Sequence, residues 1–430
     1  MAIFEKGTVI KTEFGAPIEI VSYIAGGGQG DVYVVNYNGK RKALKWYKAG
    51  VMRDPDAFYK NLKRNAEHGS PDKAFLWPDA VTEHRDGTFG YIMDLRPEGY
   101  YELGKLLGSP KYNFKTFKAA TDACLKIVSA FRILHNNGYS YQDLNDGNFF
   151  INPDTGDVRI CDNDNVAPNG TSTGILGKPR YMAPEIVVGG GKVLPDTNSD
   201  RYSLSAILFL ILFLSHPLEG KRWLVPCLTD ALAEKLYGSE ALFICDPKDS
   251  SNGPVRNIHT NLLNRWGFMP DYLKDMFLKA FSKEVLFTPG RRIAEVDWLK
   301  VLVRFRSDIV NCSCGNETFI QNAATTKCDR CGKNVVVTNV LGLPAYDMTA
   351  AKGSRIYRCQ VGICNADEAL DPVMAVVAKP TGELGLKNMT SLVFNATTPS
   401  GKSKQIAPQD IIPFIPGIKI EAYGKTVELK

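Results

Sequence analysis

Three polar residues are spaced along the chain as phosphoryl-transfer chemistry requires. Asp143 and Asn148 lie in one polar stretch in the order Asp-x-x-x-x-Asn, and Asp162 follows a short apolar-alternating run at residues 158–160. In metal-assisted transfer from a nucleotide, one carboxylate receives the proton of the attacking hydroxyl. An amide and a second carboxylate hold the metal ions that neutralise the phosphates. The plainer alternative is a polar turn between two short strands.

A glycine-rich segment precedes these residues. Residues 24–33 contain Gly26, Gly27, Gly28 and Gly30 between two runs of alternating apolar residues. Glycine lets backbone N–H groups approach a phosphate without a clash from Cβ. Because no Gly-Lys-Ser/Thr follows, the loop is not a Walker A motif. The alternative is an ordinary glycine-rich hairpin.

The next turn leads to a lysine. The dipeptide Asn38-Gly39 predicts a two-residue hairpin turn, and the returning strand carries Lys45. A lone lysine in a strand is usually a solvated edge charge. Its place one hairpin after the glycines favours contact with phosphates instead.

Later motifs follow in an order that identifies a family resemblance. Residues 177–185 read Gly-Lys-Pro-Arg-Tyr-Met-Ala-Pro-Glu, Asp200 opens an apolar helix, and Arg292 lies in a Gly-Arg-Arg-Ile-Ala-Glu run. Together with the earlier motifs, this order resembles eukaryotic-like Ser/Thr protein kinases over about residues 15–305. The resemblance implies that Asp200 braces the catalytic loop and that Arg292 pairs with the Glu of Ala-Pro-Glu.

Three shorter segments narrow the resemblance. Residues 75–78, 160–166 and 216–220 look like bacterial kinases linked to tellurite-resistance and phosphatase gene triads. This resemblance implies a protein substrate. It also implies, as partners, a phosphatase or a von Willebrand-type protein encoded nearby.

The kinase resemblance assigns roles to individual residues. Asp143 would be the catalytic base, Asn148 and Asp162 would hold Mg²⁺ (or Mn²⁺), and Lys45 would contact the α- and β-phosphates of ATP. Met93 would be the gatekeeper beside the adenine. The remaining nucleotide-binding positions would be Ala25, Gly26, Gly27, Gly28, Gly30, Val32, Asp94 and Leu95.

Two positions of the catalytic loop depart from the family pattern. Asn145 replaces a lysine, which removes a cation from the transferring phosphoryl group and costs a few kcal/mol unless another cation reaches in. Gln142 replaces an arginine, so it cannot form an ion pair with a phosphorylated activation loop.

Two further departures concern the Asp-Phe-Gly position and the N-lobe helix that would supply an acidic partner for Lys45. Asp162-Asn163-Asp164 replaces Asp-Phe-Gly, so the usual phenylalanine packing switch is absent. Glu67 is the only acidic residue between positions 58 and 71, and it falls near the end of the expected helix. The acidic partner of Lys45 therefore comes from elsewhere or is lost.

Four cysteines follow the kinase-like region. Cys312 and Cys314 form one pair, Cys328 and Cys331 form another, and each pair is followed by glycine. This pattern suits a structural four-cysteine zinc ribbon, although the first pair is C-x-C. A disulfide is the weaker alternative in a reducing cytosol. Elsewhere, cysteines 124, 161, 227 and 245 lie in apolar stretches, and we expect them in the core.

The tail, residues 336–430, alternates between apolar and polar residues and is divided by turn signals, which predicts a small β-sandwich. Residues 384–390 and 422–424 are similar to forkhead-associated domains. The tail departs from that family because Gly362 is followed by Ile363 rather than by arginine, and because no histidine follows Cys331. We expect protein docking rather than phosphothreonine recognition.

The expected fold class is α+β, in the order kinase N-lobe (1–95), kinase C-lobe (96–305), zinc ribbon (306–335) and degenerate forkhead-associated-like β-sandwich (336–430). The hydrophobic content of 44% and charged content of 23% are ordinary for soluble chains. The net charge of +6 is spread out, so we expect no nucleic-acid partner. The start of the chain has no signal-peptide core, and the longest apolar run, 204–214, is too short to span a bilayer. We expect a cytoplasmic protein without a membrane partner.

Three functions fit these motifs. The first is an active protein Ser/Thr kinase that uses ATP and Mg²⁺. The second is a pseudokinase, an ATP-binding scaffold, which Asn145 and the missing helix glutamate favour. The third is a small-molecule kinase, which also uses an Asp-x-x-x-x-Asn loop. The Ala-Pro-Glu segment and Arg292 favour the protein kinase over this third alternative.

Overall fold

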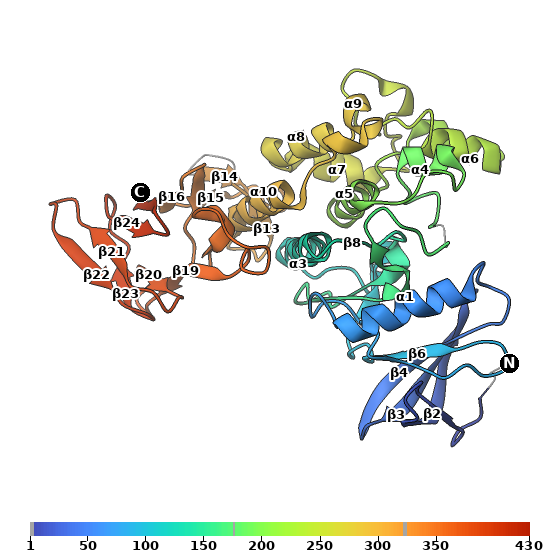
Figure 1. Cartoon of the computed structure of the whole chain (residues 1–430). Helices are drawn as coiled ribbons and strands as arrows, with labels where there is room; N and C mark the ends of the chain where they lie inside the picture. The colour runs from blue at the N-terminus through green and yellow to red at the C-terminus, as the bar shows by residue number, and fades with distance from the viewer. Residues whose placement is uncertain (1–3, 175–176, 321–324) are drawn as a thin grey trace.

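The computed structural model describes residues 4–174, 177–320 and 325–430. It has α+β architecture in three consecutive parts (Figure 1): a strand-rich N-terminal lobe, a helical lobe, and a β-rich C-terminal region. The N-terminal and C-terminal parts lie on opposite sides of the helical lobe. The two lobes expected from the motifs are therefore present, with β-rich structure after them.

The N-terminal lobe is built on one antiparallel sheet of six strands, in the order β1-β2-β3-β4-β6-β5. The strands are β1 (Val9–Lys11), β2 (Pro17–Gly26), β3 (Gly30–Tyr37), β4 (Lys40–Tyr47), β5 (Ala80–Val81) and β6 (Gly90–Met93). Asn38 and Gly39 both have positive φ, at 50° and 73°, as the predicted two-residue turn requires. This turn sets the register in which Val32 pairs with Lys45.

The helix α1 (Pro55–His68) packs beside this sheet (Figure 1). The Asp54 side chain caps its start by accepting the backbone N–H of Ala57, and a proline occupies the first turn. Phe58 and Leu62 are buried in an apolar cluster shared with the sheet. The helix is therefore held by its apolar face.

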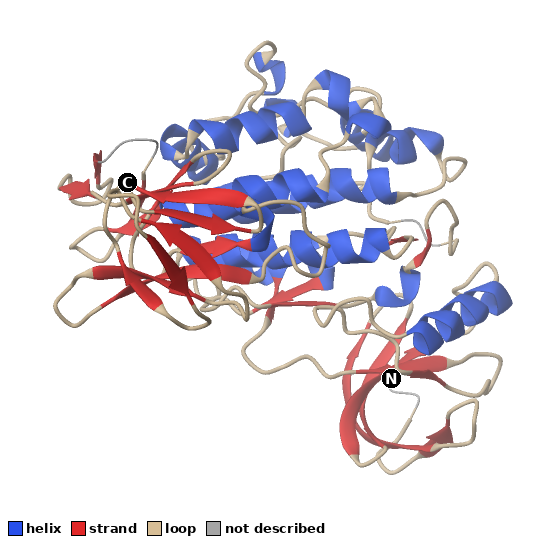
Figure 2. Cartoon of the chain, turned by 60° about the vertical axis from the view of Figure 1, so that its left-hand side comes forward, coloured by secondary structure: helices blue, strands red, loops and turns tan. Residues whose placement is uncertain are grey.

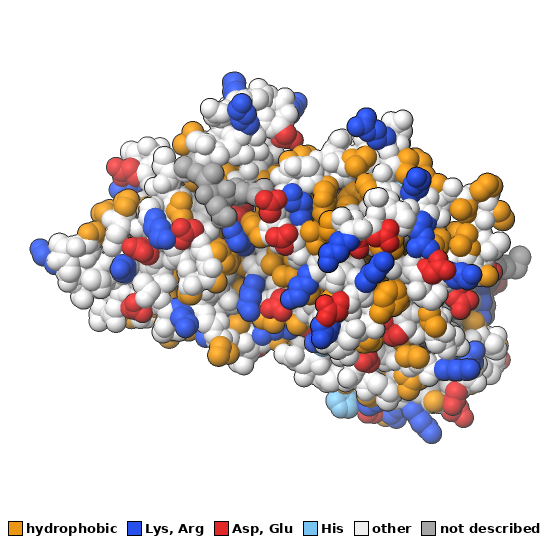
Figure 3. All heavy atoms as spheres, turned by 90° about the horizontal axis from the view of Figure 1, so that it is seen from above, with side chains coloured by type: hydrophobic (Ala, Val, Ile, Leu, Met, Phe, Trp, Pro, Cys, Tyr) orange, Lys and Arg blue, Asp and Glu red, His pale blue; other side chains and the backbone are white. Residues whose placement is uncertain are grey.

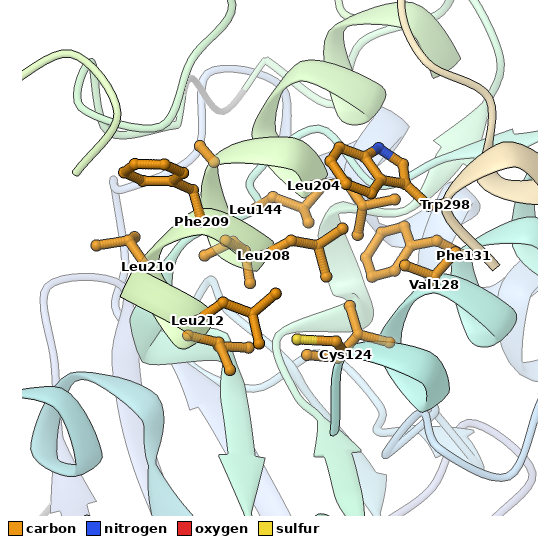
Figure 4. Packing of buried hydrophobic residues seen from close by; sticks show 14 of the residues in the cluster. Cys124, Val128, Phe131, Leu144, Leu204, Leu208, Phe209, Leu210, Leu212 and Trp298 are labelled. Carbon is orange, nitrogen blue, oxygen red and sulfur yellow. The ribbon is translucent and has the colours of Figure 1, made fainter. Parts of the chain in front are cut away.

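The helical lobe surrounds an almost wholly buried helix. Its helices are α2 (Leu103–Gly108), α3 (Phe117–Asn136), α4 (Pro184–Gly189), α5 (Thr197–Phe213), α6 (Asp230–Tyr237), α7 (Thr260–Phe268), α8 (Asp271–Ala280), α9 (Lys283–Leu286) and α10 (Glu295–Asp308). Figure 4 shows side chains of α5 such as Leu208 packing toward Phe131 and Val128 of α3 and toward Trp298 of α10. The apolar run near 204–214 therefore lies mostly in a core helix.

Short strands and 3-10 turns connect these helices. The strands are β7 (Tyr101–Glu102), β8 (Tyr139–Ser140), β9 (Phe149–Ile151), β10 (Val158–Ile160) and β11 (Ala167–Pro168). The 3-10 turns of the lobe are η1 (Asp146–Asn148), η2 (Asn163–Asn165), η3 (Lys221–Trp223), η4 (Ser250–Asn252) and η5 (Pro289–Arg291). Cys124 is buried in the core, but Cys227 is exposed in the loop between η3 and α6. The prediction that Cys227 is a core residue is wrong, because its apolar stretch runs over the surface.

One ion pair predicted from the motifs is present. Arg292 donates to the carboxylate of Glu185 at 2.8 Å and to the carbonyl of Leu286 at 2.7 Å. Arg292 is 7% exposed, so this pair is largely shielded from solvent. It anchors the start of α4 to the far side of the helical lobe, as the family resemblance implies.

The C-terminal region has two small hairpins followed by two larger sheets (Figure 2). The hairpins comprise β12 (Ile309–Asn311), β13 (Glu317–Phe319), β14 (Thr325–Lys327) and β15 (Asn334–Val336). The larger sheets have the orders β17-β16-β25-β24-β21-β22 and β18-β19-β20-β23. Their strands are β16 (Val340–Gly342), β17 (Asp347–Thr349), β18 (Arg355–Tyr357), β19 (Pro372–Ala378), β20 (Leu384–Asn388), β21 (Phe394–Thr397), β22 (Ser403–Ile406), β23 (Ile411–Pro413), β24 (Lys419–Ala422) and β25 (Lys425–Leu429), with η6 (Arg358–Gln360) after β18.

The two larger sheets enclose a separate apolar core that includes Leu341, Ile356 and Val427. Their junction with the helical lobe lies at the end of α10, where Asp308 accepts hydrogen bonds from Tyr272 at 2.6 Å and Thr349 at 3.4 Å. The β-rich region therefore packs directly on the last helix.

Charge is mixed on the surface. Figure 3 shows acidic and basic side chains interspersed over one face of the molecule. Within the described ranges, no helix combines the length and the apolar character needed to cross a bilayer.

A buried charge cluster braces the loop that carries Asp143. The carboxylate of Asp200, at the start of α5, accepts the backbone N–H groups of Tyr141 at 2.6 Å and Gln142 at 3.0 Å. His135 lies between Asp200 and Glu295, with ring nitrogens 3.1 Å and 2.8 Å from their carboxylate oxygens. The cluster therefore ties the loop to α3, α5 and α10.

This cluster predicts a pH-dependent stability. Burial disfavours the charged ring, but its hydrogen bonds to the carboxylates of Asp200 and Glu295 outweigh this effect and raise the pKa of His135 from 6.5 to about 9. A raised pKa stabilises the fold fully below pH 6.5, and the stabilisation is lost as the pH rises through about 9. The size of the shift corresponds to roughly 3 kcal/mol.

Chemical denaturation at a series of pH values measures this effect. Between pH 6.5 and 9, the unfolding free energy of the parent should fall by roughly 3 kcal/mol more than that of a His135→Gln variant. A His84→Gln variant, changed at an exposed histidine, should follow the parent. Parallel curves for the parent and the His135→Gln variant would contradict a charged His135.

Candidate active site

The structure brings four of the predicted site residues together between the lobes. Pairing of β9 with β10 sets Phe149 opposite Ile160, so Asn148 and Asp162 leave the same end of one hairpin. The amide of Asn148 donates to the carbonyl of Asp143 at 2.8 Å. The ammonium of Lys45, from β4, lies 3.2 Å from Asp162 Oδ1. One lysine, two carboxylates and an amide thus share one site.

The carboxyl of Asp143, the predicted base, has a raised pKa. Burial raises the pKa of its carboxyl to about 6, the Asn145 amide acts in the opposite direction, and the Asp162 carboxylate adds to the rise. A carboxyl with this pKa is mostly ionised at neutral pH, yet it accepts a proton more readily than an ordinary aspartate.

Asn145 connects Asp143 to Lys178. Lys178 belongs to the segment that begins at Gly177 and packs on Asp143, which is called the covering segment below. The amide nitrogen of Asn145 donates to Asp143 Oδ1 at 3.1 Å, and its amide oxygen accepts the backbone N–H of Gly147 at 3.0 Å. The same oxygen lies 3.2 Å from the ammonium of Lys178. Asn145 therefore holds the base and caps η1, but it carries no charge itself.

Lys45 has an acidic partner that sequence reasoning missed. The lysine is 6% exposed, and its ammonium lies 2.8 Å from Oδ2 of Asp164, whose side chain is fully buried. Tyr47 donates its hydroxyl to the same oxygen. Burial alone would lower the pKa of Lys45, but Asp164 and Asp162 raise that pKa well above its ordinary value. The lysine is therefore charged and paired.

The helix α1 does not supply this partner. Glu67 is exposed at its end, as its position in the sequence suggested. Instead, the amides of Asn61 and Asn65 each donate to the carbonyl of Val166 at 2.8 Å. The helix thus holds the backbone after the metal-binding segment through neutral hydrogen bonds. Asp164, two residues beyond Asp162, was the available signal for a second buried acid.

Asn163 stands where the family pattern has phenylalanine, and it is held by hydrogen bonds rather than by apolar packing. It is fully buried, and its amide donates to the carbonyls of Leu76 at 2.8 Å and Ile160 at 2.9 Å. Asp162, just before it, has a φ of 55°, in the left-handed region that aspartate tolerates better than most residues. These two features turn η2 so that Asp162 and Asp164 both reach Lys45.

The glycine-rich loop has crowded and open positions. A Cβ on Gly30 would lie 2.2 Å from the carbonyl of Trp46, and one on Gly26 would lie 2.5 Å from the carboxylate of Asp31. Close packing against backbone therefore requires glycine at position 30, while a side chain at position 26 would displace the side chains of Asp31 and Tyr23. Gly28 has open space around it, and Gly27 is nearly as open, which suits the approach of a phosphate.

A cluster of apolar side chains lies beside the strand that follows the glycine-rich loop. Met93, 7% exposed at the end of β6, pairs in register with Ala43 and belongs to a cluster that partly buried Val32, Leu95 and Cys161 pack against. Ala25 and Asp94 are exposed at its margins, and Asp94 pairs with Lys42 at 2.6 Å.

The four predicted zinc ligands converge in the C-terminal region. Their sulfur atoms all lie within 4.8 Å of one another, and the closest pairs are Cys312–Cys331 at 3.6 Å and Cys314–Cys328 at 3.7 Å. Zn–S bonds of about 2.3 Å in a tetrahedron place sulfur atoms about 3.8 Å apart, so the four thiols fit zinc.

Comparison with known proteins agrees with this geometry. Residues 92–232 match the family described as protein kinase domain. The chain is 40% identical over 93 residues to the DNA damage-responsive serine/threonine-protein kinase RqkA of Deinococcus radiodurans, covering 20% of this chain and 13% of that protein. It is 32% identical over 92 residues to the serine/threonine-protein kinase Sgk1 of Xenopus tropicalis, covering 20% of this chain and 21% of that protein.

The chain therefore spans a small part of the length of these relatives. It also resembles the solved kinase domain of PknI from Mycobacterium tuberculosis at 16% identity, with a TM-score of 0.44, over 70% of this chain and 98% of that domain. From the matched family and the named relatives, the chain contains a protein kinase domain of the Ser/Thr class. Protein kinases use ATP and Mg²⁺ and act on proteins.

The buried pair predicts a large effect of an isosteric substitution. Asp164→Asn keeps the size of the side chain but leaves Lys45 without its closest anion. Removal of one partner of a buried ion pair costs about 3 kcal/mol, while an exposed pair contributes about 1 kcal/mol at most. Denaturation by urea should therefore show a loss of about 3 kcal/mol for this variant.

Asp94→Asn is the matched control, because Asp94 forms an exposed pair with Lys42. It should change the unfolding free energy by less than about 1 kcal/mol. Equal losses for the two variants would show that Asp164 is not the main partner of Lys45.

Proposed function

We propose that the chain is an ATP-dependent protein kinase that transfers the γ-phosphoryl group of ATP to serine or threonine hydroxyls of protein substrates. The observation that carries the proposal is the convergence of Asp143, Asn148, Asp162 and Lys45 on one site between two lobes. These side chains come from three separate segments of the chain. Their functional groups are the ones that phosphoryl transfer needs.

The arrangement gives each group a task. Asp143 orients the attacking hydroxyl and receives its proton. Asn148 and Asp162 would hold Mg²⁺, which neutralises phosphate charge when bound. Lys45 holds the α- and β-phosphates, the open positions Gly27 and Gly28 lie over them, and Met93 with its apolar neighbours contacts adenine.

The observations favour an active enzyme over a scaffold. Two features had favoured a pseudokinase: a missing partner for Lys45 and a missing cation at position 145. In the structure, Asp164 pairs with Lys45, and the ammonium of Lys178 lies against Asn145. The Glu185–Arg292 pair, which anchors the start of α4, favours protein over small-molecule substrates.

Phosphoryl transfer by the purified chain tests the proposal. The parent, incubated with Mg²⁺ and labelled ATP, should label itself or a generic protein acceptor on serine or threonine. Asp143→Asn removes the proton acceptor, so its rate should fall about a thousandfold while ATP binding stays within about twofold. Asp154→Asn, at an exposed turn position, is the control and should keep the parental rate.

A parent that binds Mg²⁺ and ATP but transfers no phosphoryl group would favour the scaffold. Labelling of a small alcohol or amine in place of protein would favour the small-molecule kinase. Equal rates for the parent and the Asp143→Asn variant would remove Asp143 from the role of base.

We also propose that the four clustered cysteines hold a structural Zn²⁺ and that the β-rich region docks protein partners in the cytoplasm. The convergence of four thiols at distances suited to zinc supports the metal site. The separate core of the two larger sheets supports a distinct binding module. A phosphatase or a von Willebrand-type protein is the partner that the narrower resemblance implies.

Metal analysis tests the zinc site. The purified parent should contain one zinc per chain, and Cys328→Ser should lose most of it, because a tetrahedral site loses a quarter of its ligands. Cys227→Ser, changed at an exposed cysteine outside the cluster, should keep the parental zinc content. Full zinc content in the Cys328→Ser protein would refute this ligand set.

A further inference from the structure

We propose that Lys178, carried by the segment that covers Asp143, is the cation that acts on the transferring phosphoryl group in place of the charge that Asn145 lacks. The inference rests on the proposed kinase function. It adds a catalytic residue to the site, and it makes the position of the covering segment a condition for catalysis.

The first observation is a short chain of contacts from Lys178 to the base. The ammonium of Lys178 lies 3.2 Å from the amide oxygen of Asn145, and the amide nitrogen of Asn145 lies 3.1 Å from Asp143 Oδ1. One side-chain amide therefore separates the cation from the base. A phosphoryl group in transfer to a hydroxyl held by Asp143 would lie within reach of this ammonium.

The covering segment packs directly on the base. A Cβ on Gly177 would lie 3.1 Å from Asp143 Oδ1 and 3.4 Å from the carbonyl of Gln142. The absence of a side chain at Gly177 lets the backbone approach this closely, and Lys178 follows at the next position. The Lys178 side chain is solvent-exposed apart from its contact with Asn145, so it can turn toward a bound phosphate.

The neighbouring cations are committed to other partners. Lys45 is paired with Asp164 and Asp162. Arg180 donates two hydrogen bonds to the carboxylate of Glu219, at 2.6 Å and 2.9 Å. Lys178, in contrast, contacts a neutral amide oxygen of Asn145 at the site, which leaves its charge available to an anionic ligand.

The segment is held on both sides of Lys178 by groups that need no phosphate. On one side, the amide of Gln142 donates to the carbonyl of Thr171 at 2.8 Å. On the other side, His216 donates to the carbonyl of Arg180 at 2.8 Å, and Ser203 donates to the carbonyl of Tyr181 at 2.6 Å. Docking of the segment through these contacts positions Lys178. The neutral Gln142 thus fits a site that assembles without phosphorylation.

A fixed cation at this position should act mainly on the rate of the chemical step. Negative charge on the transferring group is redistributed in the transition state, and a preorganised charge stabilises that state more than the bound substrate. Loss of the cation should therefore lower kcat and leave KM for ATP nearly unchanged.

A charge relocation tests the proposal in the full chain. Lys178→Met removes the charge and keeps the length of the side chain, and kcat should fall about a hundredfold with KM for ATP within about threefold. The double variant Lys178→Met, Asn145→Lys places the cation at position 145 instead of position 178. Its kcat should be at least about tenfold higher than that of the Lys178→Met single variant. Lys192→Met, at an exposed lysine beyond the segment, should keep kcat within about twofold.

Thermal melting and ATP affinity of every variant accompany the rates. Recovery in the double variant supports an electrostatic role, because a merely structural loss would not be repaired by a lysine on another segment. A Lys178→Met protein with kcat within about threefold of an active parent overturns the proposal. A loss that Asn145→Lys does not repair overturns it as well. A parent without any phosphoryl transfer overturns the proposed function, and the role of Lys178 with it.

Discussion

The buried ion pair between Lys45 and Asp164 is the constraint on which the site depends. An ammonium removed from water costs several kcal/mol unless an anion and hydrogen bonds replace the solvent. The two residues are 119 positions apart in the chain, one on the N-terminal sheet and one in the turn after β10. Their contact therefore joins the lobes directly at the place where phosphates would bind.

Several local features serve this pair. The left-handed backbone at Asp162 and the two hydrogen bonds of the Asn163 amide shape η2, so that one turn presents two carboxylates to the same lysine. Asp162 is the more exposed of these carboxylates, with 40% of its side chain accessible, while Asp164 is fully buried. The buried acid therefore holds the lysine more closely, and the exposed acid keeps accessible oxygen surface.

The helix α1 takes a different part in this arrangement. Its amides at Asn61 and Asn65 hold the carbonyl of Val166, so it fixes the backbone beyond η2 without contributing charge. Neutral hydrogen bonds also hold the covering segment, through Gln142. Neutral groups therefore hold the backbone at Val166 and Thr171, while the charged Asp200 holds the loop that carries Asp143.

Much of the fold could be predicted because its signals are local. The Asn38-Gly39 turn and the apolar run in the second half of α5 each follow from residue types at short spacing. The Glu185–Arg292 pair was predictable from the order of motifs, and the clustering of the four cysteines from their paired spacing.

The partners of the charged residues could not be predicted in the same way. Asp164 pairs with Lys45, and Lys178 lies against Asn145, only because distant segments meet in a particular register. No spacing along the chain records that register. Cys227 illustrates a related limit: an apolar stretch signals burial, but the loop after η3 carries that stretch over the surface.

The central claim is that the two carboxylates at η2 have different roles: Asp164 pairs with Lys45, and Asp162 binds the metal. A crystal structure of the parent with Mg²⁺ and a non-hydrolysable ATP analogue tests it most directly. We expect Asp162 and Asn148 on the metal, Lys45 on the α- and β-phosphates, and Asp164 still within hydrogen-bond distance of Lys45. A structure in which Asp164 has turned to the metal, or in which Lys45 has exchanged Asp164 for an acid on α1, would contradict the claim.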